Sequence, residues 1–222
     1  MNLEASRKEM PVHIRQINAE DFDDVLKINA ESAPNVAKLN DAELRRLTVL
    51  ASIALVAVDS VRVAGYVLAM SSSDVYEGEE FQSFLAEFDE PFLYIDQVAV
   101  SAKARGANIA SQMYAYLRQG CHELGIFTLC CEVNLRPANP VSMKFHRKLG
   151  FVSIGEMGTR DGRLVALLRM ERPPVSPSFR AINKANKQDL PRLFEVWESS
   201  VRATHSFLTE AGIQSLIPLV KT

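Results

Sequence analysis

The feature that most constrains the fold is a strand, a turn of small residues and a helix in direct succession, over residues 92–117. The apolar, β-prone run at 92–100 is interrupted only by Asp96 and its neighbour, which predicts a buried strand. Small and basic residues fill 101–107, and from Asn108 the apolar period becomes that of a helix. The start of such a helix offers free backbone N–H groups and the positive end of its dipole. The turn is therefore suited to holding a diphosphate.

The predicted elements on either side of this unit alternate between strands and helices. Strands are predicted at 13–17, 52–58, 61–70, 128–134, 151–156 and 164–170, and helices at 21–31, 40–47 and 141–149. The central helix is expected to bury a stripe made of Ile109, Met113, Tyr116 or Leu117, Cys121 and Leu124. Because helices and strands alternate in the second half, the chain is predicted to form an α/β (α+β) fold around a mixed sheet with covered faces.

An acidic segment at 71–90 interrupts this order. It holds seven Asp and Glu residues and no Lys or Arg, and four large apolar residues recur in it at helical spacing. We expect a loop followed by a short amphipathic helix. One interpretation is a solvated acidic surface. The other is a lid whose negative field favours a cationic amine substrate.

The C-terminal region resembles the start of the chain. A linker rich in Pro and Ser at 173–178 follows the predicted domain at 10–172, and residues 179–183 (FRAIN) then parallel residues 14–18 (IRQIN). The partial repeat at 179–222 is too short to bury a core alone. It could dock on the first domain, pair with another chain in a homodimer, or begin a second domain.

Composition excludes several classes of function. A formal net charge of −2 gives no overall electrostatic basis for binding nucleic acid or an anionic membrane. No apolar run approaches the roughly 20 residues that span a bilayer, and no signal peptide is evident, so we expect a cytoplasmic protein. Three cysteines, Cys121, Cys130 and Cys131, lack metal-site spacing and fit burial in a reducing compartment, with no metal site expected. A catalytic thiol is the alternative.

Four features in order resemble the GNAT acetyltransferase superfamily over residues 10–172. The first is Val98-Ala99-Val100 at the end of the central strand, and the second is the turn at 105–110 (RGANIA). The third and fourth are Asn139 and the helix end at 145–151 (FHRKLGF). Asn108 replaces the first glycine of the family's phosphate-binding motif, and Asn is the residue that best tolerates a left-handed backbone after Gly.

The resemblance implies a mostly antiparallel central sheet of six to seven strands flanked by helices, and acetyl-CoA as the acyl donor. It also implies a set of cofactor-binding residues: Val98, Ala99, Val100, Lys103, Arg105, Gly106, Ala107, Asn108, Ile109, Ala110, Ser111, Asn139 and His146. The resemblance further implies direct transfer of the acetyl group to the amine in a ternary complex, for which no enzyme nucleophile is required.

Candidate catalytic residues follow from the chemistry of acetyl transfer. His146 stands where the family usually has a tyrosine that protonates the leaving thiolate, and a histidine with an ordinary pKa could take that role. Asp96, inside an apolar strand, is the first candidate for the base that deprotonates the amine. Tyr94 shares its face, and Glu132 on the neighbouring strand is another inward acid. Each candidate also has a structural alternative. His146 could be a partly buried packing residue, Asp96 a hydrogen-bonded interior carboxylate and Glu132 a residue on the sheet surface.

Two functions from different classes remain open. One is an N-acetyltransferase acting on an amine of a small molecule or peptide. The other is a catalytically weak module that binds acyl-CoA and regulates a protein partner. A P-loop or dinucleotide-binding protein is disfavoured, because neither GxxxxGK[ST] nor GxGxxG occurs.

Overall fold

The computed structural model describes residues 12–59, 62–171, 194 and 210. The chain divides into two compact units, Met1–Ser176 and Pro177–Thr222. The predicted linker at 173–178 lies outside the described residues, and so does the predicted repeat apart from Phe194 and Glu210. Among the described residues, no helix combines the length and the apolar character that crossing a bilayer requires.

One seven-stranded sheet forms the centre of the first unit, in the order β1-β2-β3-β4-β5-β7-β6. The strands are β1 His13–Gln16, β2 Ile53–Val58, β3 Val63–Ser71, β4 Leu93–Val100, β5 Thr128–Arg136, β6 Val152–Gly158 and β7 Leu164–Glu171. All neighbours are antiparallel except β4 and β5. The predicted mixed, mostly antiparallel sheet is therefore confirmed.

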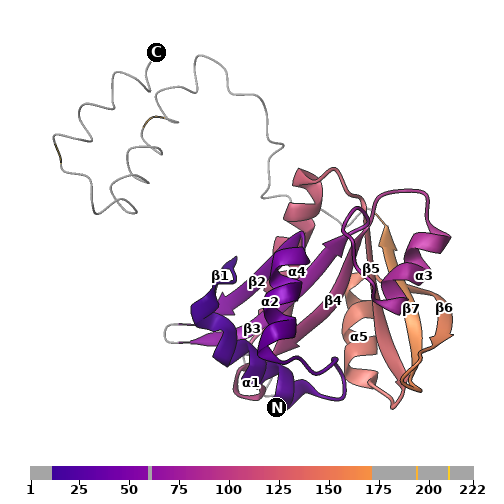
Figure 1. Cartoon of the computed structure of the whole chain (residues 1–222), viewed down its shortest axis with the longest axis horizontal. Coiled ribbons are helices and arrows are strands. Elements are labelled where there is room, and N and C mark those ends of the chain that lie inside the picture. The colour runs from indigo at the N-terminus through magenta and orange to yellow at the C-terminus, as the bar shows by residue number, and fades with distance from the viewer. Residues whose placement is uncertain (1–11, 60–61, 172–193, 195–209, 211–222) are drawn as a thin grey trace, which may run out of the picture. The chain divides into compact units, whose positions relative to one another are not determined.

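Helices cover both faces of this sheet. They are α1 Phe22–Ser32, α2 Asp41–Leu50, α3 Glu79–Glu87, α4 Ile109–Glu123 and α5 Pro140–Leu149, with short 3-10 turns η1 Ala19–Asp21 and η2 Ala102–Ala104. One core cluster contains apolar side chains of α1, α2 and α3, and the other contains those of α4, with residues of α5 packed against it. Figure 1 shows α1 and α2 lying across one face of the sheet.

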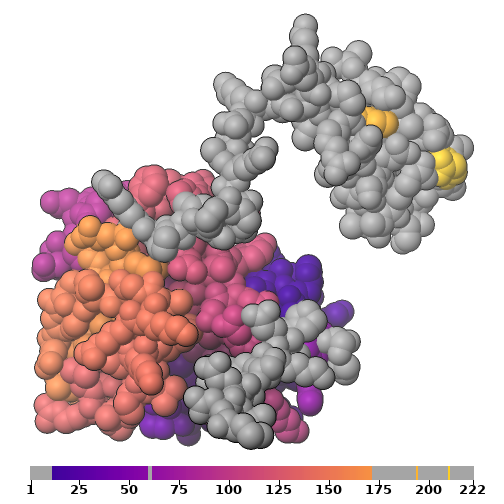
Figure 2. Space-filling view, turned by 180° about the vertical axis from the view of Figure 1, so that it is seen from behind, coloured from indigo at the N-terminus to yellow at the C-terminus, as the bar shows by residue number. Residues whose placement is uncertain are grey.

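Capping side chains set the helix boundaries. Asn40 accepts a hydrogen bond from the Glu43 N–H at the start of α2, as its sequence position predicts. Asn139 caps α5 in the same way, and Gly150 ends that helix with a φ of 102°. The edge strand β6 has mostly exposed side chains. In Figure 2 the salmon-to-orange residues, which include α5 and β6, form a broad part of the rear surface.

The predicted buried stripe of the central helix needs one correction. Ile109, Met113, Leu117 and Cys121 face the core as expected. Leu124, however, is 51% exposed, because α4 ends one residue before it and its side chain leaves the helical stripe. Of the two alternatives at the third position, Leu117 is buried and Tyr116 is exposed. Tyr114, which was not predicted, widens the stripe toward α5.

Two irregularities in β4 create the candidate site. Gln97 pairs with Leu68 and Ile95 pairs with Ala69, so Asp96 is the extra residue of a β-bulge. On the other side, β4 pairs with β5 only at Leu93 and Tyr94. Beyond Tyr94 the two strands show no further pairing among the described residues. The second half of β4 therefore presents an edge without a strand partner in this part of the chain, next to the bulge.

Candidate active site

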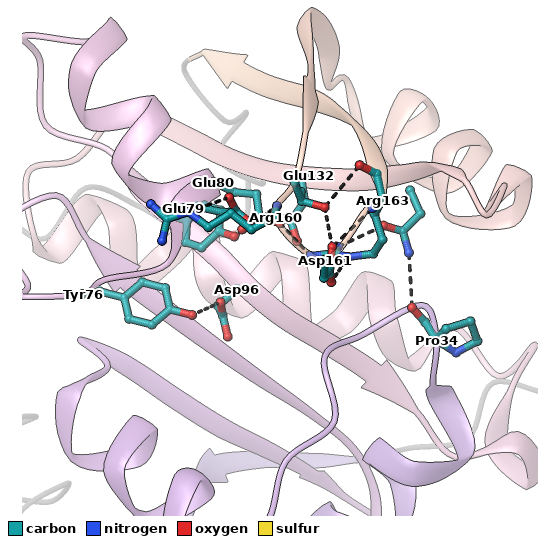
Figure 3. A network of polar contacts seen from close by, with 12 residues as sticks. Pro34, Tyr76, Glu79, Glu80, Asp96, Glu132, Arg160, Asp161 and Arg163 are labelled. Atoms are coloured by element: carbon teal, nitrogen blue, oxygen red, sulfur yellow. Dashed lines mark hydrogen bonds and ion pairs between the residues drawn. The ribbon is translucent and has the colours of Figure 1, made fainter.

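Asp96 lies at the bulge of β4 and is contacted by a tyrosine from the acidic segment. The Tyr76 hydroxyl donates to Asp96 Oδ1 at 2.5 Å, as Figure 3 shows. Burial raises the pKa of Asp96 to about 6, and the hydrogen bond from Tyr76 acts in the opposite direction. Burial also raises the pKa of Tyr76, which keeps its hydroxyl protonated and able to donate. Asp96 is thus an ionisable carboxylate that is oriented by a hydroxyl and has acceptor sites to spare.

Glu132 is the second carboxylate on this face of the sheet. It accepts a hydrogen bond from the Tyr94 hydroxyl at 2.7 Å. Burial raises the pKa of Glu132 to about 8, with the negative charges of Glu80 and Asp96 adding to the rise. Near neutral pH, Asp96 is therefore mostly ionised while Glu132 mostly keeps its proton. Tyr76 lies beside both Asp96 and Tyr94: its hydroxyl donates to Asp96, and its ring centroid is 6.4 Å from that of Tyr94.

A third carboxylate, Glu80 of α3, forms an ion pair with Arg163. Glu80 Oε1 lies 2.9 Å from a guanidinium nitrogen of Arg163, which follows the turn between β6 and β7. Arg163 also donates to Asp161 at 2.7 Å and to Asn134 Oδ1 at 3.1 Å. Figure 3 shows Arg163 beside Asp161, on the same side of the site as Glu80 and Glu132. Sequence analysis missed this group, because its members are as many as 83 residues apart.

A buried polar network holds the loop between α1 and α2 against the sheet. The side-chain amide of Asn29 donates to the Ala37 carbonyl at 2.8 Å and to Gln97 Oε1 at 3.0 Å. The Tyr66 hydroxyl donates to the same Gln97 oxygen at 2.7 Å. The Leu39 N–H donates to Asn29 Oδ1 at 2.9 Å. One signal in the sequence could have pointed to this network, namely a glutamine inside an otherwise apolar strand.

The turn before α4 has the backbone shape that a phosphate cradle needs. Gly106 has a φ of 84° and Asn108 a φ of 64°, so two of three consecutive residues are left-handed. A Cβ added to Gly106 would meet no atom within 4 Å, so the turn is open on that side. Gln112 donates to the Asn108 carbonyl, but in the described part of the chain no acceptor faces the N–H groups of Ile109, Ala110 and Ser111. These free donors, and the fact that Asn108 adopts the conformation expected of a glycine, fit an anionic group.

The remaining predicted cofactor residues lie on β4, in the turn before α4 and at the start of α5. Lys103 and Arg105 are exposed, and Arg105 Nε donates to the Val100 carbonyl at 3.3 Å. Val98 and Val100 point toward the α4 face of the sheet, whereas Ala99 belongs to the opposite core cluster. Asn139 uses its side-chain oxygen to cap α5, which leaves its NH₂ group free of intramolecular partners among the described residues. β4 therefore carries the predicted base Asp96 at its bulge and the predicted cofactor residues Val98, Ala99 and Val100 shortly after it.

His146 does not join them. Its ring is 3% exposed and packs edge-on against Tyr114, Phe145 and Phe151. Nδ1 lies 2.9 Å from the Ser142 carbonyl, which can only accept, so Nδ1 carries the proton. Nε2 then accepts from the Tyr114 hydroxyl at 2.6 Å. Burial lowers the pKa of His146, so a neutral ring results, and this placement does not favour the predicted acid role.

The three cysteines are free thiols in the core. Cys130 and Cys131 belong to opposite core clusters, as neighbours on a strand must. Burial raises the pKa of each of the three, to about 12 for Cys121. The alternative of a catalytic thiolate is therefore disfavoured. Among the described residues, no group of three or more His, Cys, Asp or Glu side chains could hold a metal ion.

Comparisons with known proteins agree on one family. The profile of the acetyltransferase (GNAT) family matches residues 14–151. No curated protein sequence matches the chain.

Many solved structures have a similar fold. Ard1 of Thermoplasma volcanium is 16% identical, with a TM-score of 0.57 over 72% of this chain and 97% of that one. Naa50 of Arabidopsis thaliana, in complex with the bisubstrate analogue CoA-Ac-MVNAL, is 15% identical, with a TM-score of 0.55 over 72% and 98% of the two chains. The yncA protein of Salmonella typhimurium, solved with its cofactor acetyl-CoA, is 15% identical, with a TM-score of 0.55 over 79% and 99%. At such identities the likeness concerns the fold.

Proposed function

Because the chain belongs to the acetyltransferase (GNAT) family, we propose that it is an N-acetyltransferase that moves the acetyl group of acetyl-CoA to an amine held at Asp96. The observation that carries this proposal is the construction of β4. One strand holds an ionisable carboxylate at its bulge, leaves its edge toward β5 unpaired, and leads into the open turn before α4.

The residues proposed to hold acetyl-CoA lie along this path. The free N–H groups at 109–111 and the cations of Lys103 and Arg105 would bind the diphosphate. The unpaired edge at Val98–Val100 would bind the pantetheine arm through backbone hydrogen bonds, and the Asn139 NH₂ group would add a donor. When bound, acetyl-CoA supplies the acetyl group as an activated thioester. The same likeness of fold extends to a protein solved with acetyl-CoA, which supports this choice of donor.

Asp96 is proposed to receive the amine and its proton. An ionised Asp96 attracts the ammonium form of an acceptor, and a pKa of about 6 makes it a better proton acceptor than an ordinary aspartate. Tyr76 fixes the orientation of the Asp96 carboxylate. Glu132, protonated near neutral pH and held by Tyr94, keeps the site from accumulating two full negative charges. Since the thiols are buried and protonated, transfer is proposed to be direct, within a ternary complex.

Two measurements, made one after the other, test the proposal. Calorimetry should detect acetyl-CoA binding, and Arg105→Ala should weaken it about tenfold to a hundredfold, through loss of a charge-assisted contact of about 1.5–3 kcal/mol. A thiol-release assay over a panel of amines should then show turnover that Asp96→Asn abolishes. Absence of binding at millimolar acetyl-CoA would refute the proposal. Binding without turnover of any amine would favour the alternative, a regulatory acyl-CoA-binding module.

A further inference from the structure

Arg163 connects three segments that surround the two carboxylates of the site. We propose that Arg163 is a specificity-determining residue: it fastens α3 and the α1–α2 loop around the acceptor site and so restricts the acceptor to small amines, excluding the amino termini of polypeptides. This inference rests on the proposed acetyltransferase function and names the acceptor class for the same site. Arg163 acts through the wall that it holds in place.

The first connection joins the β6–β7 turn to α3. All three guanidinium nitrogens of Arg163 are engaged: Nε with Asp161, one terminal nitrogen with Asn134, and the other with Glu80 of α3. Glu80 is itself buried, which strengthens an ion pair relative to one in solvent. A second link lies beside it, because the Arg160 N–H donates to Glu79 Oε1 at 2.9 Å. The turn and the first turn of α3 are thus held together.

The second connection reaches the α1–α2 loop. Asn134 accepts from Arg163, and its side-chain NH₂ group donates to the Pro34 carbonyl at 3.2 Å. Farther along, the same loop is held at Ala37 by Asn29 and by Gln97. Figure 3 shows the link from the Arg163 side of the site to Pro34, with Tyr76 and Asp96 below Glu80. Segments distant in the sequence therefore form one hydrogen-bonded rim.

The α3 side of this rim is a fixed wall. Phe81 and Phe84 are fully buried in the core cluster shared with α1 and α2. The Gln82 side chain donates to the Tyr76 carbonyl at 2.6 Å, which ties α3 to the segment that carries the hydroxyl on Asp96. The ring of Tyr76 packs edge-on against Phe81, with centroids 5.5 Å apart. Opening this wall would expose aromatic surface as well as break hydrogen bonds.

The chemistry of the rim distinguishes two classes of acceptor. Each residue of a bound polypeptide brings a backbone N–H and C=O that need partners when they lose water. The polar groups of the rim are already used on one another: Arg163, Asn134, Asn29 and Gln97. A small amine brings one ammonium group, which Asp96 can receive, and an apolar body, which the partly exposed ring of Tyr76 can contact. A rim whose polar groups are already paired therefore fits a small amine better than a polypeptide.

The test compares kcat/KM for a small primary amine with kcat/KM for a short peptide that has a free amino terminus. The parent protein should prefer the small amine at least tenfold. Arg163→Met and Glu80→Ala each break the fastening from one side, and each should lower that preference about tenfold. Arg160→Met is the matched control, because it removes a cation from the same turn and keeps the backbone N–H that donates to Glu79. The Arg160 side chain is 91% exposed and lies 3.7 Å from Glu79, an exposed ion pair that contributes little, so the preference should stay unchanged. Equal use of both acceptors by the parent, or an unchanged preference in both test variants, would overturn the proposal.

A second measurement does not depend on turnover. Amide hydrogen exchange over α3 and the α1–α2 loop should become at least several-fold faster in Arg163→Met than in the parent and in Arg160→Met. Glu80→Ala provides the same readout if Arg163→Met does not fold. Unchanged amide hydrogen exchange in Arg163→Met would refute the proposal that Arg163 holds α3 and the α1–α2 loop in place. Failure of acetyl-CoA binding would instead refute the proposed function, so the two failures are distinguishable.

Discussion

The hydrogen bond from Tyr76 to Asp96 gives a quantitative prediction for Tyr76→Phe. The variant keeps the ring, and with it the packing on Phe81 and Tyr94, but removes the hydroxyl that donates to Asp96. A hydrogen bond to a charged group contributes about 1.5–3 kcal/mol, and one pKa unit corresponds to about 1.4 kcal/mol. Because water can replace part of the lost contact, we expect the pKa of Asp96 to rise by about one unit, from about 6 to about 7.

The size of the effect of Tyr76→Phe on kcat/KM depends on the ionised fraction of Asp96 at the pH of the assay. At pH 6.5 that fraction falls from roughly three-quarters to roughly one-quarter, so kcat/KM should fall about threefold. At pH 8.5 Asp96 is ionised in both proteins, and kcat/KM should change by less than about a fifth. The other charged groups that act on Asp96, Glu80, Glu43 and Arg46, are present in both proteins.

The assay is the pH profile of thiol release between pH 5.5 and 9. Tyr116→Phe is the control, because Tyr116 is an exposed tyrosine on α4, and its profile should match that of the parent. An equal loss of kcat/KM at all pH values would mean that Tyr76 contributes packing alone. A profile with its acid limb unmoved would refute the role of Asp96 as the group that must be ionised.

Three further predictions test other parts of the site. Asn108→Gly should keep acetyl-CoA affinity, whereas Asn108→Val should cost about 1–2 kcal/mol of stability and weaken binding, because a β-branched residue resists a φ of 64°; denaturation and calorimetry would show both. Folded Glu132 holds its proton up to about pH 8, against a reference pKa of 4.5, so the free energy of unfolding should fall as pH rises from about 5 to 8. Glu132→Gln should remove on the order of 2 kcal/mol of that fall, less than the full shift because the carboxyl is only partly buried, and parallel curves would contradict the assignment. His146→Phe should cost about 1–3 kcal/mol of stability, because the Tyr114 hydroxyl loses its acceptor, but should leave the pH profile of turnover unmoved; a lost limb would restore the acid role.

Local features of the fold could be predicted because they depend on neighbours in the sequence. The Asn40 and Asn139 caps and the glycine-like backbone of Asn108 each reflect one residue type in one local context. The two faces of β5, with Cys130 on one and Cys131 on the other, reflect the strand period. The left-handed backbone of Asn108 belongs to the turn that we propose holds the cofactor diphosphate.

Other features of the site depend on contacts that periodicity does not encode. The pairing of Glu80 with Arg163 joins residues 83 positions apart, and nothing local marks either residue as a partner of the other. The position of His146 within a motif indicated which helix carries it but not that its ring faces inward, toward Tyr114. Asp96 has no partner on β3 because of the register between β3 and β4. The alternation of apolar and polar residues along one strand does not determine that register.

The bulge at Asp96 also bears on how this scaffold can change over time. A residue in regular register shares its position with a cross-strand partner, so replacing it alters the packing of two strands. Asp96 has no such partner on β3, because Ile95 and Gln97 pair with consecutive residues of that strand and leave it out of the ladder. Substitutions at position 96 can therefore alter the acidity of the site while the sheet that supports it stays the same. Acceptor chemistry can in this way diverge by single mutations without loss of the fold.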